Sequence, residues 1–315
     1  MEVNNSDLHH IVQIYTALGI GHIFVVVIPS VVFAVIVLSF MWKLMKEVGF
    51  KPVNLLFSLL AILCITGPVS YGILWDVSLI TNIPFFGNCS NAHPVFVIQY
   101  VLFSWIHTII SFTISMISVV QYVSLSHKYG RFMTSKNVFA VFLILSVASI
   151  GICCIYFNGK YVEIRGSHCK LQEYTVGIID LTVWLAFAFI LPVVTTIMFT
   201  VLTCLKVRNE VIEENTLVVK SVVRVTVLNV LSYVVLRTIA AMLYYLGTGL
   251  DPSPYSIDVW TTVARYLADL NYTLTVLSIL IIHSNIRNKI LNMTLIVSVK
   301  VKRTDDKAEA QLNSS

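Results

Sequence analysis

The chain has 315 residues, of which 57% are apolar and only 12% carry charge, and its mean hydropathy is +0.85. Soluble globular domains carry about 25% charged residues, so this composition excludes a water-soluble domain and indicates a membrane protein. In a soluble protein the net charge of +5 would suggest acidic partners. In a membrane protein it indicates basic loops beside an anionic lipid bilayer, and we expect no nucleic-acid partner.

Seven long apolar stretches, separated by short polar loops, make up most of the chain. A helix rises about 1.5 Å per residue and the hydrocarbon core is about 30 Å thick, so ~20 apolar residues suffice for one crossing. Because lipid offers the backbone no hydrogen-bond partner, each span must be a helix that closes its own bonds. We therefore predict an all-α membrane protein, a seven-transmembrane helix bundle, with spans at residues 19–45, 53–79, 94–126, 138–157, 175–205, 217–247 and 258–283.

The distribution of Lys and Arg among the loops predicts the orientation in the membrane, because cytoplasmic loops carry the excess of basic residues. Basic residues are frequent after the first, third, fifth and seventh spans, and they are absent before the first span and between the second and third. Only the loop after the fourth span, with Lys160, Arg165 and Lys170, departs from this alternation. We expect a multi-pass plasma-membrane protein with its N-terminus extracellular and its C-terminus cytoplasmic.

The chain divides into four predicted segments. Residues 1–18 form an extracellular N-terminal segment, and residues 19–283 form the seven-transmembrane bundle. Residues 284–303 alternate basic and apolar side chains, which predicts a short amphipathic helix on the cytoplasmic surface after the seventh span. Residues 304–315 are polar and of mixed charge, which predicts a disordered tail.

The outer loops contain two glycosylation sequons and two cysteines. Asn4 and Asn88 each begin an Asn-x-Ser tripeptide on the predicted outer side, so both are predicted to carry sugar. Cys89 and Cys169 are the only cysteines in the outer loops, and an exposed extracellular pair tends to oxidise, which predicts a disulfide between them. Two unrelated free thiols are the alternative. The four other cysteines fall within spans as small packing residues, and no spacing indicates a metal site.

Several short motifs resemble those of one known family. At the inner end of the third span, Gln121 and Tyr122 stand where that family has the arginine and tyrosine of its Asp-Arg-Tyr motif, and Pro192 lies where its fifth helix has a proline. Further matches are Asn54, Leu60 and Ala61 in the second span, with Cys64 in place of an aspartate, and Ile286 and Arg287 at the start of an eighth helix. With seven spans, an outside N-terminus and the cysteine pair, nearly the whole chain resembles the rhodopsin-like family of G protein-coupled receptors.

The resemblance implies a receptor that binds an extracellular ligand in the outer half of the bundle and passes a conformational change to a heterotrimeric G protein. It implies that the G-protein-facing residues are Gln121, Tyr122, Lys128, Lys220 and Arg224. The chain departs from the family by lacking Asn-Pro-x-x-Tyr, Cys-Trp-x-Pro and the motif arginine, which normally contacts the G protein. Constitutive, weak and absent coupling are therefore all open.

Charged residues inside spans are the strongest pointers to a site, because charge in the bilayer centre costs about 2.5 to 3.5 kcal/mol on insertion scales. Arg237 and Asp269 lie at matching depth on consecutive spans, and Arg265 lies one helical turn before Asp269. We predict that the three form one network. Either it pins the sixth helix to the seventh, or its two arginines leave a positive cavity that receives a carboxylate or phosphate of an anionic ligand.

Three further residues are weaker ligand-binding candidates. Gln99 and His107 lie about two helical turns apart on the third span and therefore share one side. A buried histidine serves either as hydrogen-bonded packing or as a pH sensor. Asp180, in the first outer turns of the fifth span, is either a second counter-ion or an interfacial residue.

Pro29, Pro68 and Pro192 interrupt three spans. Each removes an intrahelical hydrogen bond and crowds the preceding turn, so we expect a kink at each.

A transporter or channel of seven helices is the alternative function. Transporters tend to repeat broken helices in two halves, and the sequence has no such symmetry. We do not expect an enzyme, because no catalytic motif is present. We expect no cofactor either, since the seventh span has no lysine that could form a Schiff base with retinal.

Overall fold

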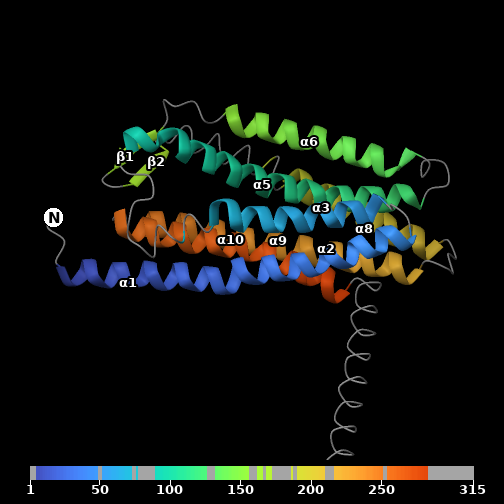
Figure 1. Ribbon diagram of the computed structural model, residues 1–315, viewed down its shortest axis with the longest axis horizontal. Coiled ribbons are helices and arrows are strands. Elements are labelled where there is room, and N and C mark those ends of the chain that lie inside the picture. Colours follow the sequence, from blue (N-terminus) through green and yellow to red (C-terminus); the bar gives the residue numbers. More distant parts are fainter. Residues whose placement is uncertain are drawn as a thin grey trace, which may run out of the picture.

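The computed structural model describes residues 5–48, 52–72, 76, 89–125, 132–155, 162–165, 168–171, 186, 190–209, 216–250 and 254–282. These residues form long helices that lie side by side and one two-stranded hairpin (Figure 1). In chain order the elements are α1 (Asn5–His22), the π-helical turn η1 (Ile23–Val27), α2 (Ile28–Val48), α3 (Pro52–Gly67), the π-helical turn η2 (Pro68–Gly72), α5 (Cys89–Ser124), α6 (Ser135–Ile155), β1 (Val162–Arg165), β2 (His168–Leu171), α8 (Leu191–Asn209), α9 (Thr216–Leu250) and α10 (Pro254–Ile282).

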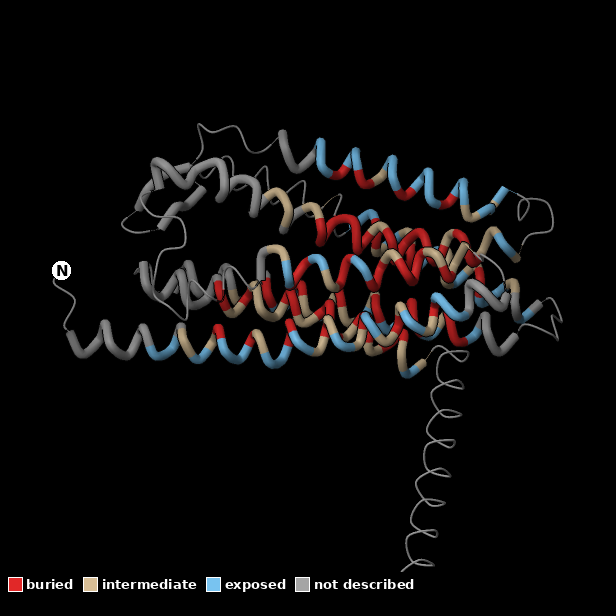
Figure 2. Tube along the Cα trace, viewed as in Figure 1, coloured by how far each residue is buried: buried red, intermediate tan, exposed pale blue. Residues whose placement is uncertain are grey.

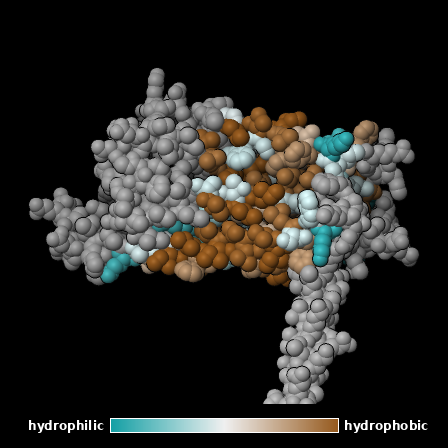
Figure 3. Space-filling model, viewed as in Figure 1, coloured by the Kyte–Doolittle hydropathy of each residue, from teal (hydrophilic) through white to brown (hydrophobic). Residues whose placement is uncertain are grey.

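Among the described residues, five helical stretches are long and apolar enough to cross a membrane: Thr16–Lys43, Pro52–Ser70, Trp105–Ser124, Lys220–Ala240 and Thr262–Ile282. They coincide with the first, second, third, sixth and seventh predicted spans. The fourth and fifth predicted spans coincide with shorter apolar helices, Ser135–Gly151 and Leu191–Lys206. Apolar side chains form a broad belt over the described surface in Figure 3. The all-helical fold class is thus confirmed, whereas the count of seven crossings remains a prediction.

Helix α5 lies at the centre of the bundle. It packs against α3, α6, α8 and α9, while α9 and α10 pack closely along each other. In the most apolar part of α5, within Trp105–Ser124, 78% of the residues are buried. In the corresponding part of the first helical stretch, Thr16–Lys43, only 28% are buried. Figure 2 shows the buried residues concentrated on the inward faces of the described helices. Side chains on α5 therefore meet partners from most of the other helices.

Apolar side chains cover the outside of the described bundle, and many polar side chains lie among the apolar ones inside it. Large apolar side chains face outward on α6 and α8, including Ile144, Val147 and Val194, which are 67%, 69% and 57% exposed. Polar side chains such as Thr113 and Asp269 are fully buried. Lipid favours this arrangement, because an outward apolar side chain is solvated by acyl chains and an inward polar side chain finds hydrogen-bond partners.

Each proline that was expected to interrupt a span lies at a π-helical turn. Turn η1 ends directly before Ile28 and Pro29, Pro68 begins η2, and the π-helical residues Ala186 and Ile190 precede Pro192. A π turn inserts an extra residue into the helical ladder and so accommodates the hydrogen bond that proline cannot make. These turns also change which residues face the core from one side of the proline to the other.

The structure adds two features that the sequence analysis did not predict. Helix α1 begins at Asn5 and runs without interruption through η1 into α2, so most of the predicted N-terminal segment is helical. Between α6 and α8, strands β1 and β2 form an antiparallel hairpin in which Val162 pairs with Leu171 and Ile164 with Cys169. The hairpin contacts α5. The predicted amphipathic helix at residues 284–303 and the tail lie outside the described residues.

Candidate functional site

Charged and aromatic side chains are buried together where α1, α5, α9 and α10 meet. We refer to them as the polar cluster; its members are His22, Asp76, His107, Arg237, Tyr266, Asp269 and Tyr272. Helix α10 contributes three of them at intervals of three residues, a spacing that keeps side chains on one helical face. His22, Asp76, His107, Arg237 and Asp269 are each at most 6% exposed.

His22 lies between two carboxylates. Its Nδ1 is 2.8 Å from Oδ2 of Asp76, and its Nε2 is 3.4 Å from Oδ2 of Asp269. The Tyr266 hydroxyl donates a hydrogen bond of 2.8 Å to the other oxygen of Asp76, and the Tyr266 ring stacks on the imidazole with centroids 4.0 Å apart. His22 therefore ties α1 to Asp76 and to α10.

His107 lies between an arginine and a carboxylate. The Arg237 guanidinium contacts Nδ1, and Nε2 is 3.2 Å from Oδ1 of Asp269. A guanidinium only donates hydrogen bonds, so Nδ1 must accept and the imidazole proton must lie on Nε2, facing Asp269. The Tyr272 hydroxyl lies 3.1 Å from Nε2, and its ring stacks on the imidazole with centroids 5.1 Å apart. A neutral His107 thus relays the contact between Arg237 on α9 and Asp269 on α10.

The structure brings together the strongest residues of the predicted network. Arg237 and Asp269 are buried in one cluster, and His107, predicted as a weaker candidate, lies between them. Arg265 is half-buried on α10 and acts electrostatically on Asp269. The side chain of Gln99 and the whole of Asp180 lie outside the described residues.

Four members were missed by the sequence analysis: Tyr266 and Tyr272 on α10, and the ionisable pair His22 and Asp76. Both are polar residues within the first and second predicted spans, so the rule that singled out Arg237 applied to them as well. Asp76 adds a second buried carboxylate, and His22, whose two ring nitrogens face Asp76 and Asp269, can donate to both carboxylates only as the positively charged imidazolium. The predicted surplus of positive charge therefore stays a prediction.

Further hydrogen bonds continue along α10 away from the polar cluster. Ser30 on α2 bonds Thr273 at 2.9 Å. Ser232 on α9 donates to the Asn271 side-chain oxygen at 3.1 Å, and Ser278 donates to that of Asn229 at 2.8 Å. Such bonds hold helices together where lipid offers no alternative partner.

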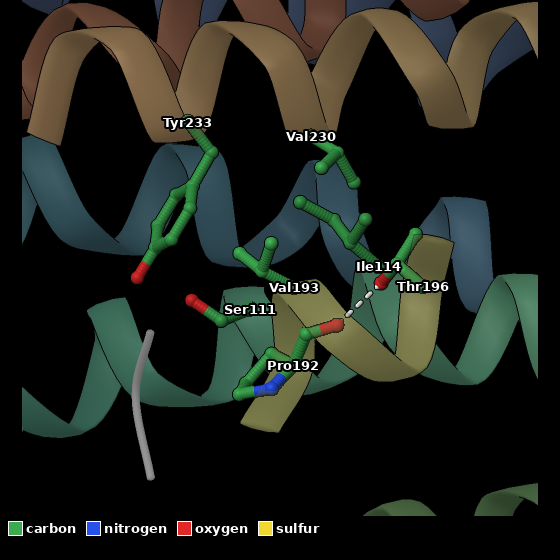
Figure 4. Close-up of a pocket in the computed structure, with 7 residues that line it drawn as sticks. All are labelled: Ser111, Ile114, Pro192, Val193, Thr196, Val230 and Tyr233. Carbon is green, nitrogen blue, oxygen red and sulfur yellow. Dashed lines mark hydrogen bonds between the residues drawn. The ribbon is translucent and has the colours of Figure 1, made fainter. Parts of the chain in front are cut away.

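A second polar contact lies at the proline of α8, shown in Figure 4. The Pro192 carbonyl accepts hydrogen bonds from Ser115 of α5 at 2.8 Å and from Thr196 at 2.7 Å. Beside it is a cavity of about 10 Å³ between α5, α8 and α9, about the space of one water. Tyr233 lines this cavity and also lies beneath the Arg237 guanidinium, 5.5 Å from ring centroid to Cζ. The proline contact and the polar cluster therefore adjoin through Tyr233.

The residues expected to face a G protein lie in different environments. Gln121 is buried, and Tyr122 is half-buried in edge contact with Phe199, with the Lys206 amine 5.8 Å from its ring centroid. Lys220 and Arg224 on α9 are exposed. Lys128 lies outside the described residues, as do Asn4, Asn88 and the side chains of Cys89 and Cys169. No group of metal-ligating side chains occurs within the described ranges.

These features define a multi-pass helical membrane protein with ionisable groups buried in its interior. No family model matches the chain, and no curated protein matches it. Among solved structures, the crystal structure of squid rhodopsin has a TM-score of 0.72 to this chain at 14% sequence identity, covering 91% of this chain and 87% of that one. The likeness extends over nearly the whole chain and shows a rhodopsin-like fold.

Proposed function

We propose that the protein is a rhodopsin-like G protein-coupled receptor with seven crossings, placed in the plasma membrane with its N-terminus outside. The observation that carries this proposal is the rhodopsin-like fold over 91% of the chain. In this role the protein binds an extracellular ligand in the outer half of the bundle, signals to a heterotrimeric G protein and has no enzymatic activity.

The polar cluster is the proposed element through which ligand binding acts. It joins α1, α5, α9 and α10, and its contact between Arg237 and His107 ties α9 to α5. A ligand shifts a conformational equilibrium only by its difference in affinity for the two states. A polar ligand group that takes the place of His107 on Arg237 would bind best when α9 has moved away from α5, and would therefore favour that state.

The charges of the cluster bear on the chemistry of the ligand. Asp76 lies beside His22, and Asp269 lies beside His22 and His107 and interacts with Arg265, so two carboxylates already offset part of the positive charge of the cluster. We propose a polar ligand that exchanges hydrogen bonds with the cluster, with an anionic group as a further candidate for Arg237. Both kinds of group can accept from the guanidinium.

At the inner side, Lys220 and Arg224 are the proposed contacts to the G protein, since both are exposed on α9. Buried Gln121 occupies the place of the family's arginine, so we propose that coupling depends on the exposed basic residues more than on the third helix. The basic side chains suit acidic partner surfaces.

The disulfide between Cys89 and Cys169 belongs to the same proposal. Helix α5 begins at Cys89 and contacts β2, the strand that carries Cys169. A bond there would fix the hairpin over the end of α5 and restrict the chain between α6 and α8. Peptide mapping under non-reducing conditions tests it, with glycosylation at Asn4 and Asn88 read from the same digest.

A ligand screen with G-protein biosensors in cells tests the receptor function. The parent chain is expected to respond to at least one ligand, and Arg237→Gln to lose that response at equal surface expression. Thr238→Ala, at the exposed neighbouring position, serves as the matched control and should respond like the parent. An ion current without any biosensor response would instead identify a channel.

A further inference from the structure

A groove on the outside of the bundle forms a second site, separate from the polar cluster. It has a volume of about 280 Å³ and lies between α5, α6 and α8. Its walls are almost entirely apolar and include Phe112, Met116, Val138, Val141 and Leu191. An apolar cavity of about 150 Å³ already holds a benzene-sized molecule, so this groove has room for a considerably longer apolar group.

The groove opens onto the surface that faces lipid. Val141 and Leu191 at its walls are 47% and 48% exposed. Other outward residues of the same two helices, Val147 on α6 and Val194 on α8, are more exposed still. The groove is therefore continuous with the apolar surface that the bilayer covers, and the molecules that have access to it from there are membrane lipids.

The end of the groove at the start of α6 has a polar lining residue, and a basic residue lies next to it in the chain. Asn137 lines it, and its side-chain amide donates 2.8 Å to the Phe132 carbonyl. The preceding residue, Lys136, is exposed. Basic residues at a cytoplasmic membrane surface attract anionic headgroups. The charge at this end therefore complements the phosphate of a phospholipid whose acyl chain points along the groove.

We propose that the groove is a binding site for one anionic phospholipid, with an acyl chain between α5, α6 and α8 and the headgroup at Lys136. This proposal rests on the membrane placement given above and is independent of ligand binding or G-protein coupling.

The groove adjoins the proline contact of α8. Ser115 and Pro192 line it, and the same two residues form the hydrogen bond that joins α5 to α8. A lipid chain in the groove therefore packs against both sides of this contact. Occupancy should favour the arrangement of α5 and α8 in which the groove is open.

Photolabelling of the full chain in lipid nanodiscs tests the proposal. The probe is phosphatidylserine with a diazirine in its acyl chain, and labelled peptides are identified by mass spectrometry. For the parent chain we expect label on peptides of α6 and α8 that line the groove. Unlabelled phosphatidylserine should compete for this labelling better than phosphatidylcholine.

Two pairs of variants test the acyl-chain site in the groove and the headgroup site at Lys136 separately. Val141→Trp fills the groove and should lower labelling by roughly fivefold or more, because the added ring takes the volume of the acyl chain. Val147→Trp places the same ring on the exposed face of α6 and should leave labelling unchanged. Lys136→Gln should weaken phosphatidylserine labelling by roughly fivefold, the factor that corresponds to about 1 kcal/mol per basic residue near anionic lipid. Lys43→Gln, at an exposed position on α2, should not.

Equal loss of label in Val141→Trp and Val147→Trp would overturn the groove as the binding site. Equal competition by phosphatidylserine and phosphatidylcholine on the parent chain would overturn the headgroup assignment. Displacement of the label by a sterol, with no effect of phospholipid, would show that the occupant is a sterol and not a phospholipid. Because the competition experiments use the parent chain, they decide the proposal even if a variant fails to fold.

Discussion

At the scale of single residues, the charged side chains of the polar cluster each lie against a charged or hydrogen-bonding partner. His107 is the clearest case, because its two ring nitrogens serve opposite purposes: Nδ1 accepts from Arg237 and Nε2 faces Asp269. A side chain that offers one acceptor and one donor is required at this position. Removing either function leaves a buried polar group without a partner, which costs about 1 to 3 kcal/mol and more for a charged group.

His107→Leu should therefore destabilise the protein by about 3 kcal/mol or more, as expected when a buried charge loses its partner. His107→Gln should cost much less, because its carbonyl can accept from Arg237 and its amide can donate to Asp269. Thermal unfolding of the detergent-solubilised chain measures both. If the two variants unfold at the same temperature, the relay through His107 is not what stabilises the cluster.

Gly67 leads to a second prediction at this scale. A Cβ atom at this position would lie 2.9 Å from the ring of Tyr272, a residue 1% exposed that stacks on His107. Gly67→Ala should push that ring away from His107 and cost about 1 to 3 kcal/mol, the range for overpacking a core. Thermal unfolding gives the cost.

Gly151→Ala is the matched control, because nothing lies within 4 Å of a Cβ there. Alanine in a helix interior is about 0.5 to 1 kcal/mol better than glycine, so the control should be neutral or slightly stabilised. The second substitution Tyr272→Leu should recover part of the loss in Gly67→Ala. Equal effects of the two glycine substitutions would contradict the close approach of α3 to α10.

At the scale of elements, each π turn marks a point where a proline interrupts the regular hydrogen bonding of a helix. Helix α8 begins at such a point, and its Pro192 carbonyl takes hydrogen bonds from both Ser115 and Thr196. Two hydroxyl groups thus share one acceptor, and either can satisfy it alone. This redundancy should stabilise the contact between α5 and α8 against single substitutions.

Ser115→Ala and Thr196→Ala should each lower the free energy of unfolding much less than the double variant does. The double variant leaves the buried Pro192 carbonyl without a side-chain donor, which costs about 1 to 3 kcal/mol. The effects are therefore expected to be non-additive, with a coupling energy of about 0.5 kcal/mol or more. Thermal unfolding of the parent, both single variants and the double variant gives this coupling. Strict additivity would mean that the two hydroxyls act on different groups.

At the scale of the whole molecule, the arrangement of polarity determines the fold. The apolar stretches alone were enough to predict the helical bundle, because lipid leaves the backbone no other conformation of that length. Arg237 and Asp269 were found for the same reason, since a charge in a span must face inward. Their direct pairing was predicted from equal depth, but the rotation of α5 that inserts His107 between them is set by packing.

His22 and Asp76 show where sequence reasoning stopped. Their partners come from α1, α10 and a position beyond η2, and the π turns alter the face that each helix presents. The hairpin, in contrast, is indicated by its local sequence. Residues 162–165, Val-Glu-Ile-Arg, alternate apolar and charged side chains as a strand does, and the Gly-Ser pair that follows is typical of a two-residue turn. Long-range rotation could not be read from the sequence, whereas the hairpin could.

The orientation in the membrane and the odd number of crossings make one joint prediction for the whole chain. An epitope tag at the N-terminus should bind antibody on intact cells, whereas a tag at the C-terminus should bind only after permeabilisation, because the basic loops hold that side in the cytoplasm. Asn4→Gln should remove a glycosidase-sensitive mass shift, which marks the N-terminal side independently of the tag. Staining of the C-terminal tag on sealed cells would mean an even number of crossings or the opposite orientation. The described apolar parts of α6 and α8 are shorter than those of the other helices. A cysteine-accessibility scan through these two helices would then show which one fails to cross the membrane.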